Sequence, residues 1–162
     1  MAGFSSGGGY TFIVENCIIE KGISNLSGKN HLFIRNNLIS NGIIKDAGDA
    51  PEGIEAHIVE NNDITYTYNP ENWNAQEAAI VISSQSITLK NNRIRAKNNC
   101  SGIISIAKSP TNFIDNIIIC DKPTDLLNDN FCGIITSSGE GVVTGNTIIG
   151  GKMGYNSSSA AS

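Results

Sequence analysis

The chain has 162 residues, a formal charge of −4 at pH 7 and a hydrophobic fraction of 40%. This length allows one compact domain with an ordinary core. The acidic balance excludes a broad basic surface for nucleic acid or an anionic membrane. No apolar run approaches the roughly 20 residues that span a bilayer, and residues 1–6 lack the pattern of a secretory signal.

The composition favours β-strands joined by tight turns. The chain contains 26 Ile but only 6 Leu, together with 21 Asn and 17 Gly. Ile is typical of strands, and Asn and Gly supply the backbone conformations that sharp turns need. The sequence therefore predicts an all-β protein.

A six-residue box recurs six times along the chain: an apolar residue, any residue, a polar residue or Gly, then Asn, any residue and Ile. The copies are residues 13–18, 34–39, 59–64, 89–94, 113–118 and 143–148. Their anchor residues are Asn16, Asn37, Asn62, Asn92, Asn116 and Asn146, at intervals of 21, 25, 30, 24 and 30 residues. The mean period of 26 indicates a repeat protein with loops of unequal length.

Each box is interpreted as a corner between two short strands. The two apolar positions point inward, and the polar pair turns the chain, because Asn tolerates a left-handed backbone. Stacked corners place equivalent residues about 4.8 Å apart, the spacing of paired strands. A primary amide both donates and accepts hydrogen bonds, so we expect the six anchor Asn side chains to form one column.

A second recurring element precedes several boxes and is interpreted as another strand of each coil. It begins at Gly22, Ala79, Gly102 and Gly133. The third repeat leaves two alternatives: either Gly53 begins its counterpart after a very short turn, or residues 42–44 are the counterpart and residues 45–53 form a loop.

A leucine-rich repeat is the competing solenoid, but it needs an apolar residue eight positions before the Asn. Five of the six boxes lack one, and Leu is scarce. The fold class that we predict is all-β, a right-handed parallel β-helix of about six coils with an Asn-rich corner ladder. It would span residues 10–150, between a flexible N-terminal segment (residues 1–9) and a Ser/Gly-rich tail (residues 151–162).

Over residues 10–150 the chain resembles the right-handed parallel β-helix proteins of the pectate-lyase-like superfamily, whose coils carry this Asn-rich corner. Polysaccharide lyases, polygalacturonase-like hydrolases, tailspikes and adhesins belong to that group. The resemblance implies binding of a polysaccharide or cell-surface glycan on a lateral groove, with or without cleavage by a lyase or glycoside hydrolase reaction. It also implies an extracellular, cell-surface or virion location.

The catalytic motifs of that superfamily are largely missing. Polygalacturonase-like hydrolases carry Asn-Thr-Asp, Asp-Asp, Gly-His-Gly and Arg-Ile-Lys motifs. Here residues 61–63 and residues 93–95 echo the first and the last of these, and both fall within or beside a box. We interpret both as corner residues. Whether the protein is an enzyme stays open.

The densest group of ionisable residues lies between the second and third boxes. In an extended strand Glu55 and His57 share one face, and they point outward together if Ile54 and Ala56 point inward. A carboxylate beside an imidazole can perform acid–base chemistry, so these two are the predicted catalytic residues. An ordinary solvated strand face is the alternative.

Predicted glycan-binding residues lie on either side of the third box. Tyr66, Tyr68 and Trp73 follow it, and Asp49 and Glu52 precede it. Aromatic rings among amides and carboxylates suit sugar stacking. The alternative is that the rings pack back onto the coil.

No metal site, cofactor or disulfide is expected. The four Cys residues form no CxxC pair and have no His at a zinc-site spacing, so Cys17 and Cys120 are interpreted as small buried hydrophobic residues. Three functional hypotheses follow: glycan recognition, a structural module of a shaft, adhesin or phage fibre, and a complete small lyase or epimerase. Both ends of a β-helix expose unpaired strand edges, so a homo-oligomer or a larger parent chain is expected to cover them.

Overall fold

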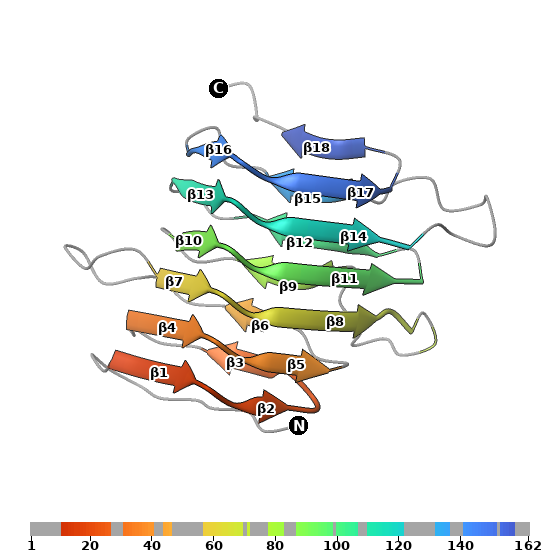
Figure 1. The fold of residues 1–162 in the computed structure, drawn as a ribbon. Helices are drawn as coiled ribbons and strands as arrows, with labels where there is room; N and C mark the ends of the chain where they lie inside the picture. Colours follow the sequence, from red (N-terminus) through yellow and green to blue (C-terminus); the bar gives the residue numbers. More distant parts are fainter. Residues whose placement is uncertain are drawn as a thin grey trace.

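The computed structural model describes residues 11–26, 31–40, 44–46, 57–69, 71, 78–82, 87–98, 100–106, 110–121, 132–136, 141–151 and 153–157. Within these residues every regular element is a β-strand and every strand pair is parallel. Three strands make one coil and six coils stack, so the chain is a parallel β-helix (Figure 1).

Each coil contributes one strand to each of three sheets. The first sheet contains β1 (Thr11–Glu15), β4 (His31–Arg35), β7 (His57–Glu60), β10 (Ile87–Lys90), β13 (Thr111–Ile114) and β16 (Val143–Thr144). The second sheet contains β2 (Ile18–Ile19), β5 (Leu38–Ser40), β8 (Asp63–Thr67), β11 (Arg93–Lys97), β14 (Ile117–Cys120) and β17 (Thr147–Gly150). The third sheet contains β3 (Ile23–Leu26), β6 (Ile44–Asp46), β9 (Ala78–Ile82), β12 (Ser101–Ser105), β15 (Cys132–Thr136) and β18 (Met153–Ser157).

The core explains why the chain is rich in Ile. In the second sheet, the residue two positions after each corner is always Ile, and the strand register stacks these side chains in one inward column. The column contains Ile19, Ile39, Ile64, Ile94, Ile118 and Ile148. Its four inner members are fully buried, and full burial of each stabilises the fold by roughly 1.5–3 kcal/mol.

The first and second sheets meet at a two-residue corner, which we call the Asn corner. Its first residue has a left-handed backbone in every coil, with φ between 52° and 66°. These residues are Asn16, Asn36, Asn61, Asn91, Asp115 and Gly145. Asn, Asp and Gly are the residue types that adopt this conformation at least cost.

The second residue of the Asn corner forms the predicted column, and we call its five amides the Asn ladder: Asn37, Asn62, Asn92, Asn116 and Asn146. The Oδ1 atom of Asn92 accepts hydrogen bonds from the backbone N–H of Asn62 and from its Nδ2 atom, at 3.1 and 3.0 Å. The Nδ2 atom of Asn92 donates to the Oδ1 atom of Asn116 and to the Val59 carbonyl. All four hydrogen-bonding positions of this buried amide are therefore used.

The prediction that Asn16 is the sixth member of the column is wrong. Val14 is the register partner of Ile34, so the first box is residues 14–19 and Cys17 takes the ladder position. The Cys17 N–H still donates to the Oδ1 atom of Asn37, at 3.0 Å, which keeps the corner geometry without an amide side chain. Because residues 18 and 19 are both Ile and Cys17 replaces the Asn, the box pattern matches residues 13–18 and not the true register.

The third sheet decides between the two alternatives for the third repeat. Ile44 pairs with Ile23 on one side and with Ile80 on the other, so the counterpart is residues 42–44, of which residue 44 is described. The sixth coil continues past residue 150, because β18 pairs with β15 inside the segment expected to be a tail. Residues 1–9 lie outside the described residues.

Candidate functional site

The predicted catalytic pair is only partly described. His57 begins β7 with 3% of its surface exposed, and its Nδ1 atom accepts a hydrogen bond from the Leu32 N–H at 3.1 Å. The imidazole faces the interior, so the outward orientation expected for it is wrong. Its register partner Ile87 is also fully buried, which shows that this position of the first sheet points inward. Glu55 lies outside the described residues, as do Asp49 and Glu52.

The described tyrosines after the third box pack against the core. Tyr66 is buried in the hydrophobic core, and Tyr68 is half-buried and packs against it. Tyr66 belongs to an inward column of the second sheet. On the next two coils this column continues with Ala96 on β11 and Cys120 on β14. These two small side chains leave volume for one large ring. Trp73 lies outside the described residues.

A row of cations occupies the outer face of the second sheet. Arg93 and Arg95 on β11 are exposed, and Lys97 is half-exposed, whereas the alternate residues Ile94 and Ala96 are buried. Side chains two residues apart on a strand are about 6.7 Å apart along one face. This basic row therefore presents three regularly spaced positive groups to solvent.

Polar and aliphatic side chains border the basic row on both sides. On β8, Asp63 pairs with Arg93, Thr65 with Arg95 and Thr67 with Lys97. On β14, Ile117 pairs with Arg93 and Ile119 with Arg95. The face thus combines cations with a carboxylate, hydroxyl groups and aliphatic surface.

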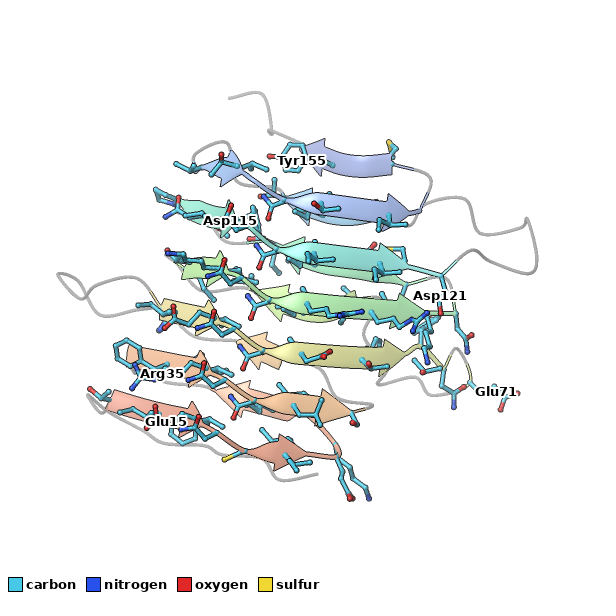
Figure 2. The ribbon with its side chains drawn as sticks, in the orientation of Figure 1. Glu15, Arg35, Glu71, Asp115, Asp121 and Tyr155 are labelled. Atoms are coloured by element: carbon cyan, nitrogen blue, oxygen red, sulfur yellow. The ribbon has the colours of Figure 1, made fainter. Side chains whose placement is uncertain are left out.

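Among the residues that the structure describes, one ion pair involves the basic row. The Nε atom of Arg95 lies 3.5 Å from an Oδ1 atom of Asp121, with about half of the Arg95 side chain exposed (53%). An exposed pair at this distance contributes little stability, so the guanidinium remains available to another anion. Figure 2 shows Asp121 at the end of β14, beside the second sheet.

The first sheet carries charge in a different arrangement. Its outward column reads Glu15, Arg35, Glu60 and Lys90 along four successive coils. The Nε atom of Arg35 donates to the Oε2 atom of Glu15 at 2.6 Å (Figure 2). Opposite charges alternate here, so this column is largely self-compensated.

Sequence reasoning took residues 93–95 as corner residues and did not identify the basic row. The signal was present, because an Arg-Ile-Arg-Ala-Lys segment alternates cations with apolar residues at the strand period. The pairing of this segment with β8 and β14 shows that it is a strand and not a corner.

Cys17, Cys100 and Cys120 are free thiols. Cys17 is exposed, so its expected burial is wrong, whereas Cys120 is buried as expected. Burial, together with the neighbouring Cys120, raises the pKa of the Cys100 thiol to about 12. A thiol with this pKa is protonated at neutral pH and is a poor nucleophile.

Among the described residues, no three His, Cys, Asp or Glu side chains come together as a metal site. The same part of the chain contains no helix long and apolar enough to cross a membrane. Comparison of the chain with protein-family models, with curated protein sequences and with solved structures gave no significant match.

Proposed function

We propose that the chain binds an acidic polysaccharide along the outer face of the second sheet, as a module of a larger carbohydrate-binding protein. The observation that carries this proposal is the basic row of Arg93, Arg95 and Lys97 on β11. Asp63 lies beside Arg93 and Asp121 beside Arg95, so the row presents three cations against two neighbouring carboxylates.

The chemistry of the face suits an anionic glycan. A guanidinium can hold a carboxylate or sulfate through two parallel hydrogen bonds. The neighbouring hydroxyl groups of Thr65 and Thr67 can donate to or accept from sugar hydroxyls. Ile117 and Ile119 offer aliphatic surface for the apolar face of a sugar ring.

The proposal includes a relationship to the pectate-lyase-like superfamily and an extracellular, cell-surface or virion location. The parallel coils and the Asn ladder support the relationship, since a column of buried amides at one corner is what the resemblance implies. The proposal concerns recognition alone. His57 has no part in it, because its imidazole faces the interior.

The test compares binding of two double variants to three acidic glycans (polygalacturonate, alginate and chondroitin sulfate) and to neutral dextran. The variant R93Q/R95Q removes two charges from the basic row, and the matched control R35Q/K90Q removes two from the first sheet. We expect binding to the acidic glycans only, weakened at least about tenfold in R93Q/R95Q and unchanged in the control. Binding should also fall as salt is added. Equal binding by both variants, or equal binding of dextran, would contradict the proposal.

A structural module of a shaft, adhesin or fibre is the second candidate. The observation that favours it is the compensated charge column of the first sheet, because a self-neutralised polar face suits a rigid spacer better than a binding surface. Absence of binding to all three acidic glycans in the same experiment, with the fold intact, would favour this candidate.

A further inference from the structure

The last coil leaves the Asn ladder open. In the five preceding coils the backbone N–H at the ladder position donates to the Oδ1 atom of the next Asn, at 2.9–3.1 Å. Within the described residues, no acceptor lies opposite the Asn146 N–H. The second Nδ2 hydrogen of Asn146 turns back to the Thr144 carbonyl in its own coil, at 3.0 Å. The C-terminal end thus presents donors that the earlier coils use to bind a following coil.

Inward-facing side chains are also uncovered at this end. Val143 continues the column of Phe113 and is 45% exposed, whereas Phe113 is 1% exposed. Tyr155 on β18 continues the column of Ile134 and is 43% exposed (Figure 2). Both residues occupy positions that another coil would bury, so a further coil on this end would remove a substantial apolar area from water.

The N-terminal coil carries inward side chains that match those uncovered at the C-terminal end. Val14 and Ile19 occupy the same inward columns as Val143 and Ile148, and both are half-buried. On the outer side Ile18 is 79% exposed. A second copy placed on the C-terminal end in continuous register would set its Val14 on Val143 and its Ile19 on Ile148.

The outer columns match as well. Ile13 belongs to the outward column of the first sheet that runs through Phe33 and reaches Asn112. The Oδ1 atom of Asn112 accepts from the Val142 N–H, so Val142 continues that column at the C-terminal end. Ile13 and Val142 are each about half exposed, at 52% and 51%. The second copy would bring these two exposed side chains together.

We propose that copies of the chain stack head to tail, with the N-terminal coil of one copy on the C-terminal coil of the next. All strand pairs among the described residues are parallel, and only this orientation continues the three sheets as parallel pairs. Tail-to-tail stacking would instead place the Asn146 N–H against another donor. This contact repeats the coil–coil contact that the chain already makes within itself. Because it joins two different surfaces, each added copy leaves a free end, and the copies form an open linear assembly.

Cys17 limits the strength of this junction. It stands at the ladder position of the first coil, so the Asn146 N–H of one copy meets a thiol in the next copy and not an amide oxygen. Sulfur is a weak acceptor, so each junction lacks one ladder hydrogen bond. The substitution Cys17→Asn supplies the missing Oδ1 atom and should strengthen stacking by about fivefold or more.

The experiment is sedimentation velocity of the full chain over about three decades of concentration, since association by mass action depends on concentration. Val14→Lys blocks the N-terminal end and Val143→Lys blocks the C-terminal end, because both residues lie in the inward column that the junction would bury. We expect the unchanged protein to grow in steps of one copy, and each Lys variant alone to remain a monomer. An equimolar mixture of the two variants should form a dimer, because each retains the end that the other lacks.

Three results would overturn the proposal: a monomer at every concentration for both the unchanged chain and Cys17→Asn, a dimer of Val14→Lys alone, or no dimer in the mixture. The second result would instead indicate tail-to-tail stacking. Circular dichroism establishes that each variant keeps its fold. If Val143→Lys does not, Tyr155→Lys replaces it, and Ile19→Lys replaces Val14→Lys in the same way, since Tyr155 and Ile19 belong to inward columns at the two ends.

Discussion

The Asn corner and the two other corners of each coil differ in how strictly their length is kept. The Asn corner has two residues in all six coils, from residues 16–17 to residues 145–146. The connection from the second to the third sheet covers residues 20–22 in the first coil but residues 68–77 in the third. The Asn corner keeps one length because its ladder side chain must hydrogen-bond the equivalent side chain of the next coil. The other connection makes no such ladder among the described residues, so its length can vary.

The largest effect is expected from breaking the ladder at its centre. Asn92→Leu removes a buried amide whose atoms make four hydrogen bonds, to Asn62, Asn116 and Val59. Because the partners stay buried without replacement, the free energy of unfolding should fall by about 3 kcal/mol in a urea titration. The control is Asn146→Leu at the open end, which has one neighbouring coil and should cost about 1 kcal/mol. Equal losses at both positions would show that the ladder does not act as a column.

The next effect concerns Cys100, in the corner between β11 and β12, and it appears only at alkaline pH. The folded-state pKa of its thiol is about 12, raised by burial and by Cys120 from an ordinary value of 9.0. The unfolded chain therefore loses this proton at a lower pH than the folded chain. The contribution of the Cys100 thiol to the free energy of unfolding is fully present below pH 9 and is lost as the pH rises toward 12. Thermal unfolding should show a steeper fall in Tm above pH 9 for the unchanged protein than for Cys100→Ala. The exposed Cys17→Ser serves as the control and should keep the steeper fall.

A smaller effect is expected at the left-handed residue of the Asn corner. Asn91 has φ 53°, where a Cβ atom costs about 1–2 kcal/mol unless the side chain compensates. We expect Asn91→Ala to lower the free energy of unfolding by about 1 kcal/mol, and Asn91→Gly to leave it nearly unchanged. If Ala and Gly are equivalent in a urea titration, the conformation is not what selects Asn here.

The smallest effect is expected from the exposed ion pair between Glu15 and Arg35 in the first sheet. Both side chains are about 40% exposed, so solvent screens their attraction. Arg35→Ala should change the free energy of unfolding by less than about 0.5 kcal/mol, and added salt should reduce the difference further. A loss comparable with that of Asn92→Leu would mean that outward charges, and not inward amides, hold the coils in register.

The fold could be predicted from the sequence alone because the residues of the Asn ladder recur in the sequence as a repeat. Asn and Ile recur at fixed places in the box, and those places correspond to one buried amide and one buried Ile per coil. The first box was misaligned because Ile18 and Ile19 are identical and Cys17 replaces the amide. At that position only the backbone N–H of Cys17 continues the pattern, and a backbone group leaves no trace in the sequence.

The candidate site was less predictable. The inward orientation of His57 follows from the third box, because its first residue, Val59, points inward and His57 lies two residues earlier on the same face of β7. The expectation for His57 assumed instead that Ile54 and Ala56 point inward. Tyr66 has an amphipathic ring that suits either a sugar or a core. The small Ala96 on the next coil, followed by Cys120 on the coil after that, leaves room for the ring in the core. These neighbours are 30 or more residues away in sequence and become adjacent only through coil stacking.

Hydrogen exchange of the Asn side-chain amides, followed by NMR, tests the Asn ladder most directly. The Nδ2 hydrogens of Asn62, Asn92 and Asn116 are bonded and buried, whereas Asn61 and Asn91 of the same corners are exposed. We predict slow exchange for the first three and fast exchange for the other two. Equally fast exchange for both groups, with the backbone amides of β8 and β11 still protected, would contradict a continuous column of buried amides.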